Sequence, residues 1–102
     1  MAQLVVTYGK PADPAAFDAH YRDVHVPLAQ KIPGLRRFEL SDGPVSTPEG
    51  PSDVHSIAIL TFDSLSDLQT ALASPEGQAA AADVANFASG GASMQMYETR
   101  AV

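Results

Sequence analysis

The sequence predicts an α+β fold with the element order β-α-β-β-α-β, the ferredoxin-like arrangement. Three observations lead to this prediction. Four short segments rich in β-branched and aromatic residues are separated by longer stretches, two of which have helical periodicity. The third short segment is nearly apolar, which is typical of a central strand. At 102 residues, the chain can form one domain without a disulfide or metal staple. We therefore expect a single domain over residues 1–102, with a four-stranded antiparallel sheet and both helical regions on one face.

The first strand and the first helical region are expected within residues 3–32. Residues 3–8 are mostly β-branched or aromatic and are followed by a glycine. Asp13 followed by Pro14 is typical of a helix N-cap and the first helical position. One face of this helix then carries, together with His20, the apolar residues Phe17, Tyr21, Val24 and Leu28. Because Pro27 cannot donate a backbone hydrogen bond, we expect a kink or break near residues 25–26 and a short continuation to residue 32.

The second half of the chain contains three further strands and the second helical region. We expect strands in residues 35–42, 54–62 and 92–100, and a proline- and glycine-rich loop in residues 43–52. Ser64 is expected to cap a helix whose apolar stripe consists of Leu65, Leu68 and Leu72. Ser74 and Pro75 restart the helix, and its expected apolar residues are Ala79, Ala82, Val84 and Phe87.

The composition of the third strand predicts a partner. This strand is apolar on both sides, the helices cover only one face of the sheet, and no element remains to cover the other. A second copy of the chain would cover it, with two sheets packed face to face as a closed, dimeric α+β barrel. We therefore expect a homodimer that associates through the sheet face and has a largely apolar interface.

The composition argues against several other classes of protein. Twelve acidic and six basic residues give a net charge of −6, which disfavours binding to nucleic acid or an anionic membrane. The chain has no cysteine and therefore no disulfide, thiolate nucleophile or thiolate metal site. No run approaches the roughly 20 apolar residues of a membrane span, and the first residues lack signal-peptide features. We expect a cytoplasmic protein that binds neither nucleic acid nor membrane.

Two stretches of the chain resemble a known family. The run Tyr-Arg-Asp-Val-His-Val-Pro-Leu-Ala-Gln-Lys-Ile-Pro-Gly-Leu, residues 21–35, resembles the signature of the EthD family in the dimeric α+β barrel superfamily. Residues 62–69 and 74–79, followed by Asp83 and Phe87, resemble the second helical region of that family. The resemblance implies a ferredoxin-like fold, a homodimer and a pocket between sheet and helices in each subunit. By motif, His25 matches the family's pocket histidine.

The resemblance implies less about the activity. The family is named after a protein linked to ethyl tert-butyl ether degradation and is usually grouped near oxidoreductases. Its relatives include methylmuconolactone isomerases, polyketide cyclases and cofactor-free monooxygenases. For this chain, these relatives imply a reaction on a small molecule that needs no cofactor.

His25 and Tyr21 are the candidate catalytic residues. A histidine beside a phenol at a partly buried helix break suits general acid–base chemistry. Tyr21 lies four residues before His25, so its hydroxyl could orient a substrate carbonyl or the imidazole. The structural alternatives are a helix-terminal histidine bonded to free carbonyls and a tyrosine that is simply part of the core.

Five further residues are candidates for substrate binding, each with a structural alternative. His20 points inward in the helix stripe and could instead be a boundary histidine with a polar partner. His55 opens the third strand, on the face of Ile57 and Ile59, and either lines the pocket mouth or lies in solvent. The other candidates, which could equally serve ordinary packing, are Tyr8, Met94 and Met96.

The spacing of the two neighbouring histidines argues against a metal site. His20 and His25 are five residues apart, which separates them by about 140° on a continuous α-helix. On this geometry they neither chelate one ion nor act as a pair, and no other ligand motif is present. We expect no metal ion and no cofactor.

Two classes of function follow from these residues. The first is a cofactor-independent oxidoreductase, isomerase or cyclase/lyase that uses His25 as acid and base on a small apolar or aromatic substrate. The second is a binding or carrier module of a degradation pathway without chemistry of its own. A cavity of about 300 Å³ or more with His25 projecting into it would fit a typical ligand site. A filled cavity would instead indicate a structural dimer.

Overall fold

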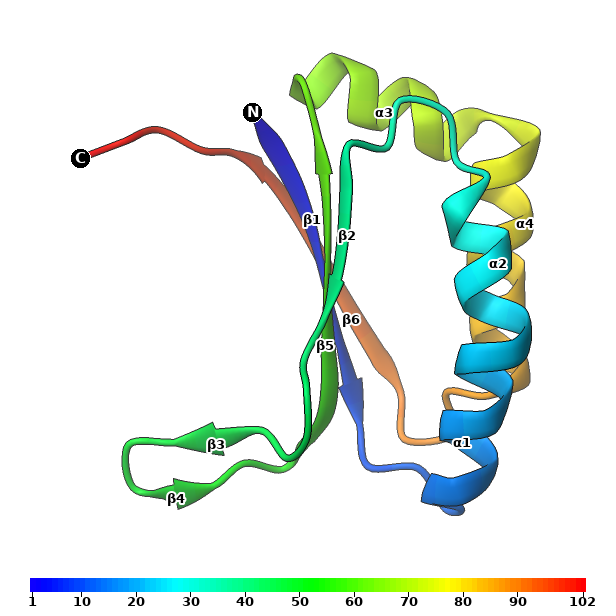
Figure 1. The fold of residues 1–102 in the computed structure, drawn as a ribbon, viewed down its shortest axis with the longest axis vertical. Coiled ribbons are helices and arrows are strands. Elements are labelled where there is room, and N and C mark those ends of the chain that lie inside the picture. The colour runs from blue at the N-terminus through cyan, green and yellow to red at the C-terminus, as the bar shows by residue number, and fades with distance from the viewer.

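The computed structural model describes residues 1–102, and a four-stranded antiparallel sheet in the order β2-β5-β1-β6 forms one of its two layers. The strands of this sheet are β1 (Ala2–Gly9), β2 (Arg37–Leu40), β5 (Val54–Phe62) and β6 (Ala92–Glu98). The second layer lies on one face of the sheet (Figure 1) and contains the helices α1 (Pro14–His20), α2 (Val26–Gln30), α3 (Leu65–Ala73) and α4 (Pro75–Asp83). The ferredoxin-like fold predicted from the sequence is therefore confirmed.

The side-chain alternation of β1 determines which face of the sheet carries the core. Leu4, Val6 and Tyr8 are buried under the helices, and the residues between them are half-buried on the opposite face. The register pairs Val5 with Ile59 of β5, which lies between β1 and β2 as the sequence predicts. The face that carries Val5 and Ile59, here called the outer face, is covered by no element of the chain (Figure 1).

Two segments project from the sheet on the side of the outer face. The predicted loop 43–52 contains a small two-stranded ribbon, β3 (Ser46–Thr47) and β4 (Gly50–Pro51), which extends away from the sheet (Figure 1). The C-terminal residues after β6 leave the sheet toward the same side, at its other end (Figure 1). The outer face is therefore framed by two arms.

Three helices start at the capping residues that the sequence predicts. The Asp13 Oδ1 accepts a hydrogen bond from the Ala16 N–H at 3.1 Å. Ser64 caps α3 and Ser74 caps α4 in the same way, with Oγ–N distances of 3.0 and 3.1 Å. Each cap satisfies a backbone donor that the first helical turn leaves free, so these local signals fix the helix starts.

A π-helical turn replaces the helix break predicted near Pro27. Residues Tyr21–His25 form this turn between α1 and α2, and the Val26 N–H bonds to the Tyr21 carbonyl, five residues earlier. Pro27 in the first turn of α2 has no N–H to continue the ordinary four-residue ladder. The predicted kink or break near residues 25–26 takes the form of a π turn, which absorbs one extra residue and lets the helix continue past the proline.

The buried face of α4 also differs from the predicted one. Its buried residues are Gly77, Ala80 and Asp83, and not Ala79 and Ala82. A side chain at Gly77 would collide with the carbonyl of Ala71, so the glycine allows α4 to pack closely against the end of α3. The buried face of α4 that contains Gly77 also contains Asp83. None of the helices combines the length and the apolarity that crossing a membrane requires.

Candidate functional site

A small cavity lies between the sheet and the helical layer. Its floor includes Leu4, Val6 and Leu60, and its helical wall includes Ala29 and Ile32 of the α2 region. The α3–α4 region contributes Leu72, Ala80 and Val84. The only groups in the lining that can exchange a proton belong to Tyr8, Tyr21 and His25. The cavity is therefore apolar, with three side chains that can interact with a polar atom.

The cavity is smaller than a typical ligand site. Its volume is about 50 Å³, room for a few water molecules at roughly 10–15 Å³ each. The criterion of about 300 Å³ is therefore not met, whereas His25 does line the cavity. Met94 of β6 also lines the cavity, and it is 48% exposed. Met94 is therefore a flexible, exposed part of the cavity wall.

His25 lies in the interior and is fixed by Asp83. Only 6% of His25 is exposed, and its Nδ1 lies 3.0 Å from the Asp83 Oδ2. Because an ionised carboxylate only accepts hydrogen bonds, Nδ1 must carry the proton, and Nε2 keeps its lone pair. Burial lowers the pKa of His25 and outweighs the opposite effect of the hydrogen bond to Asp83. At neutral pH the imidazole is therefore neutral, with its basic nitrogen not engaged by Asp83.

Asp83 accepts hydrogen bonds from three side chains. The His20 Nε2 lies 2.9 Å and the Asn86 Nδ2 3.0 Å from its Oδ1, while His25 bonds to Oδ2. Burial alone would raise the pKa of Asp83, but the bonds from Asn86, His20 and His25 together hold this pKa below its usual range. The carboxylate therefore remains ionised in a buried position and carries the negative charge of the site.

The two histidines therefore act on one carboxylate, contrary to the prediction from their spacing. That prediction assumed an α-helix, in which residues five apart diverge by about 140°. In the π turn the backbone hydrogen bonds span five residues, so His20 and His25 lie on the same side of the helix and reach Asp83.

Asp83 is the residue of the site that the sequence reasoning missed. It lies between Ala80 and Phe87, three and four residues away, in what proves to be the buried stripe of α4. A carboxylate in an apolar helix stripe needs hydrogen-bond partners, because burying it unpaired is costly. The position of Asp83 in an apolar stripe was therefore the sequence signal that could have revealed it. The histidines of the first helix were the candidate hydrogen-bond donors to its carboxylate.

Tyr21 and Tyr8 lie next to His25 in an aromatic cluster. The ring centroids of Tyr21 and His25 are 5.0 Å apart, and those of Tyr21 and Tyr8 are 5.6 Å apart. Phe87 contacts all three rings. Burial raises the pKa of Tyr21 well above its usual value, with a further contribution from Tyr8. Tyr8 is 1% exposed and lies at the centre of the cluster.

The other candidate residues lie in different surroundings. His20 does not line the cavity; its ring stacks on Phe87, and its side chain is 28% exposed. Met94 lines the cavity, whereas Met96, on the same face of β6, does not. The two methionines are about half exposed, and β6 is an edge strand of the sheet.

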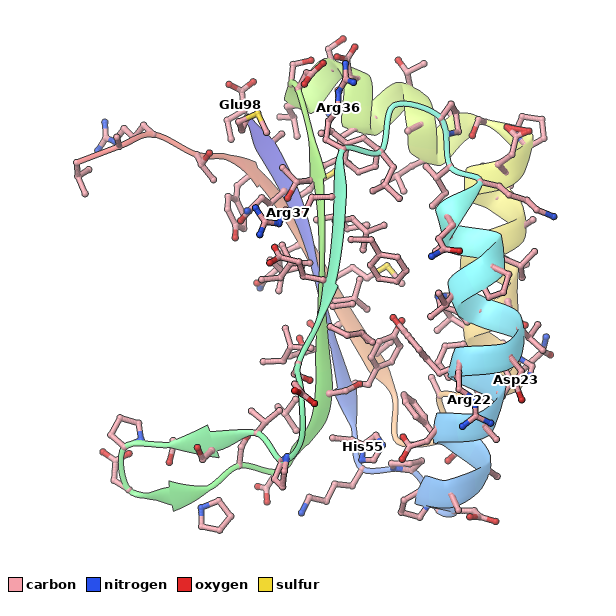
Figure 2. The ribbon with its side chains drawn as sticks, in the orientation of Figure 1. Arg22, Asp23, Arg36, Arg37, His55 and Glu98 are labelled. Atoms are coloured by element: carbon pink, nitrogen blue, oxygen red, sulfur yellow. The ribbon has the colours of Figure 1, made fainter.

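His55 is also outside the cavity. Its Nε2 lies 2.9 Å from the Asp18 Oδ1 of α1, and its ring packs edge-on against Phe17. Figure 2 shows His55 at the lower end of the sheet. The pairing of β1 and β5 shifts at this end, so that Tyr8 faces Ser56 and Gly9 faces Val54. The prediction that His55 shares a face with Ile57 was wrong, because this irregularity reverses the strand alternation at His55.

The lowered pKa of His25 predicts a pH dependence of stability. The unfolded chain binds a proton at this imidazole near pH 6.5, whereas the folded protein does so only at a lower pH. The contribution to stability is complete above pH 6.5 and is lost as the pH falls toward the folded pKa, by at most about 1.4 kcal/mol per pH unit. Urea unfolding between about pH 5 and pH 8 measures this slope. The slope is expected to flatten in His25→Asn, and an unchanged slope in that variant would contradict the assignment.

Comparisons with known proteins agree with this architecture. The model of the EthD domain matches residues 10–91. A Rhodococcus erythropolis protein, described as an uncharacterized 11.0 kDa protein in the thcB-thcC intergenic region, is 48% identical over 103 residues, which cover 100% of this chain and 98% of the relative. The crystal structure of an ethyl tert-butyl ether degradation (EthD) family protein from Bacillus halodurans is 34% identical, with a TM-score of 0.89 and coverage of 98% of this chain and 99% of that one.

More distant structures share the fold. SnoaB from Streptomyces nogalater, described as a cofactor-independent oxygenase, has a TM-score of 0.70 at 16% identity and covers 99% of this chain and 94% of its own. A Bacteroides fragilis protein of ferredoxin-like fold, described as dimeric, has a TM-score of 0.66 at 19% identity, with coverage of 96% and 95%. At these identities the likeness concerns the fold alone. The match of the family model over most of the sequence, together with the 34% identical structure, shows that the chain belongs to the EthD family.

Proposed function

We propose that this protein is a cofactor-independent enzyme that uses His25 as a general base on a small, mostly apolar substrate. The observation that carries this proposal is the buried pair of His25 and Asp83 at the wall of an apolar cavity. The ionised carboxylate holds the imidazole in the tautomer whose Nε2 can accept a proton. A buried, neutral imidazole is in the correct protonation state for a base at neutral pH.

The chemistry of the pair resembles the histidine–aspartate half of a catalytic triad. A weakly acidic C–H or O–H of the substrate gives its proton to Nε2, and the electron pair stays on the substrate. The imidazolium that forms is stabilised by Asp83 at 3.0 Å, which remains ionised. Tyr21, whose ring neighbours His25, orients the substrate or the imidazole through its hydroxyl.

The fate of the deprotonated substrate distinguishes the possible reactions. Return of the proton to another carbon is an isomerisation, and attack of the carbanion within the molecule is a cyclisation. Reaction with dioxygen is an oxygenation, the class in which SnoaB is described. All of these need a dry cavity and one base, so the proposal concerns their shared first step.

Hydrogen–deuterium exchange tests that step without knowledge of the natural substrate. Enolisable ketones that contain a single ring are incubated with the protein in D₂O. The loss of the NMR signal of the acidic C–H then measures the exchange. We expect the protein to accelerate exchange and His25→Ala to lower the rate by about 10²- to 10⁴-fold. The matched control is His55→Ala, because His55 lies outside the cavity.

The same variants separate the enzyme from a carrier. If His25→Ala loses exchange but still binds the ketone, His25 acts as a base. If the wild-type protein binds ketones without exchange, and His25→Ala loses the binding, the protein is a binding or carrier module instead.

We also propose that the protein is a homodimer that associates through the outer face. Val5, Ile57 and Ile59 form the apolar centre of this face, and the Arg37–Glu39 ion pair of β2 lies at its edge (Figure 2). An apolar centre with a charged rim is the usual anatomy of a subunit interface. The two arms that frame this face are placed to contact the partner (Figure 1).

A further inference from the structure

The polar end of the cavity contains two phenols in addition to His25. Tyr8 is 1% and Tyr21 5% exposed, and both line the cavity. Their rings meet edge to face at 5.6 Å, and both rings pack on Phe87. Phe17 and Phe87 surround this pair, so the two rings have little freedom to turn away from the cavity.

Both phenols keep their protons at neutral pH. Burial is the largest influence on each of them; it raises the pKa of Tyr8 to about 12 and that of Tyr21 well above its usual value. Both side chains line the cavity, so their hydroxyl protons are available to an acceptor there.

The charges around the cavity restrict the ligand. No lysine or arginine lines it, so a carboxylate or phosphate would have no counter-ion. The ionised Asp83 lies directly behind His25 and would repel a ligand that arrives as an anion. An uncharged ligand avoids both costs, and its apolar part can contact the aliphatic side chains of the sheet and helices.

We propose that Tyr8 and Tyr21 form a phenol pair that binds the oxygen atom of an uncharged ligand, either a phenol or an enolisable carbonyl compound. This proposal rests on the proposed function of His25 as a base. When the ligand loses its proton to the His25 Nε2, its electron pair moves to the oxygen. The oxygen then accepts a hydrogen bond from the phenol pair. The phenols bind the developing charge without giving up their protons, as in an oxyanion hole.

The phenol pair gives the cavity a direction. The oxygen of the ligand lies against Tyr8 and Tyr21, its acidic hydrogen faces His25, and its apolar part extends toward Leu72 and Met94. Hydrogen bonds to ionised acceptors are stronger than those to neutral ones. The pair therefore stabilises the deprotonated ligand more than the neutral one, which is the requirement for catalysis.

Binding of 4-nitrophenol tests the phenol pair, since its phenolate and neutral forms absorb at different wavelengths. We expect the wild-type protein to bind this probe and to lower its apparent pKa. Tyr8→Phe and Tyr21→Phe are each expected to weaken binding of the phenolate by about tenfold or more. Tyr97→Phe is the matched control, because Tyr97 is an exposed tyrosine that bonds to Gln3 on the outer face. The carboxylate probe 4-nitrobenzoate is expected not to bind.

Three results would overturn the phenol pair. These are wild-type binding that Tyr8→Phe and Tyr21→Phe leave unchanged, binding of 4-nitrobenzoate as tight as that of 4-nitrophenol, and a wild-type protein that binds neither probe. Circular dichroism of both variants confirms that the removal of one hydroxyl leaves the fold intact. The exchange experiment with His25→Ala is independent of this binding. If the wild-type protein does not bind the phenolate but still catalyses exchange through His25, the phenol pair is disproved and His25 remains the base.

Discussion

Replacement of Asp83 by alanine is expected to lower the free energy of unfolding by about 3–5 kcal/mol. The buried carboxylate accepts hydrogen bonds from His20, His25 and Asn86, and its removal leaves these donors without an acceptor. The buried His25 has no access to bulk water to replace the lost bond. Urea unfolding followed by circular dichroism measures the loss.

The same substitution is expected to remove the preference of the His25 ring for the tautomer that carries its proton on Nδ1. Without the carboxylate, no group fixes the proton on Nδ1, and the imidazole is free to place it on Nε2. Nitrogen-15 NMR of the ring distinguishes the two tautomers and gives a readout that a loss of stability alone would not move. Asp83→Asn is the conservative variant, since it keeps the volume of the side chain and removes its charge.

Asp23 provides the matched control for Asp83. Asp23 accepts a hydrogen bond from the neighbouring Arg22, with 2.8 Å between the Arg22 Nε and the Asp23 Oδ1. In contrast to Asp83, both side chains are mostly exposed (Figure 2). Asp23→Ala is expected to change the free energy of unfolding by about 0–1 kcal/mol. If Asp83→Ala were equally mild and left the His25 tautomer unchanged, the carboxylate would not position the imidazole.

A charge at the centre of the outer face is expected to separate the proposed dimer into monomers. Ile59 lies opposite Val5 of β1 and Glu39 of β2, in the middle of this face. Burial of an unpaired carboxylate in an apolar interface costs several kcal/mol, which is a large part of the affinity of a typical dimer. Sedimentation equilibrium of Ile59→Asp is therefore expected to give the mass of one chain, and that of the wild type twice this mass.

Val24→Asp is the control for this experiment. Val24 is a 41% exposed apolar residue of the helical layer, and it does not belong to the sheet. The Val24→Asp substitution is expected to leave the mass of the dimer unchanged. A wild-type protein that sediments as a monomer at micromolar concentration, or an Ile59→Asp variant that remains dimeric, would contradict association through the outer face.

The elements whose signals are local could be predicted from the sequence. The third strand lies at the predicted residues, Val54–Phe62, because its apolar composition has no other stable place than the centre of the sheet. Asp13, Ser64 and Ser74 start their helices because a capping side chain acts within three residues. The second strand is shorter than predicted, at Arg37–Leu40, and backbone hydrogen bonds to β5 continue for one residue beyond each end, from the Arg36 N–H to the Thr61 carbonyl and from the Ser41 N–H to the Ile57 carbonyl.

The candidate site could be predicted only in part, because its geometry depends on contacts between distant segments. His25, Tyr21, Tyr8 and Met94 line one cavity, whereas His20, His55 and Met96 lie outside it. The position of His55 depends on a shift in the pairing of β1 and β5, and a strand pattern read from one segment cannot reveal such a shift.

The sequence by itself determined the order of the elements, the helix caps, the central strand and the place of His25 near the end of a helix. Only the tertiary structure decided that His20 and His25 share Asp83. A π turn changes the angle between residues five apart, and its hydrogen bonds leave no periodic pattern in the sequence. Asp83 is buried on the same face of α4 as Gly77, which packs closely against the end of α3, and this packing exists only after the chain has folded. Local hydrogen bonds thus fixed the elements, and packing between them fixed the site.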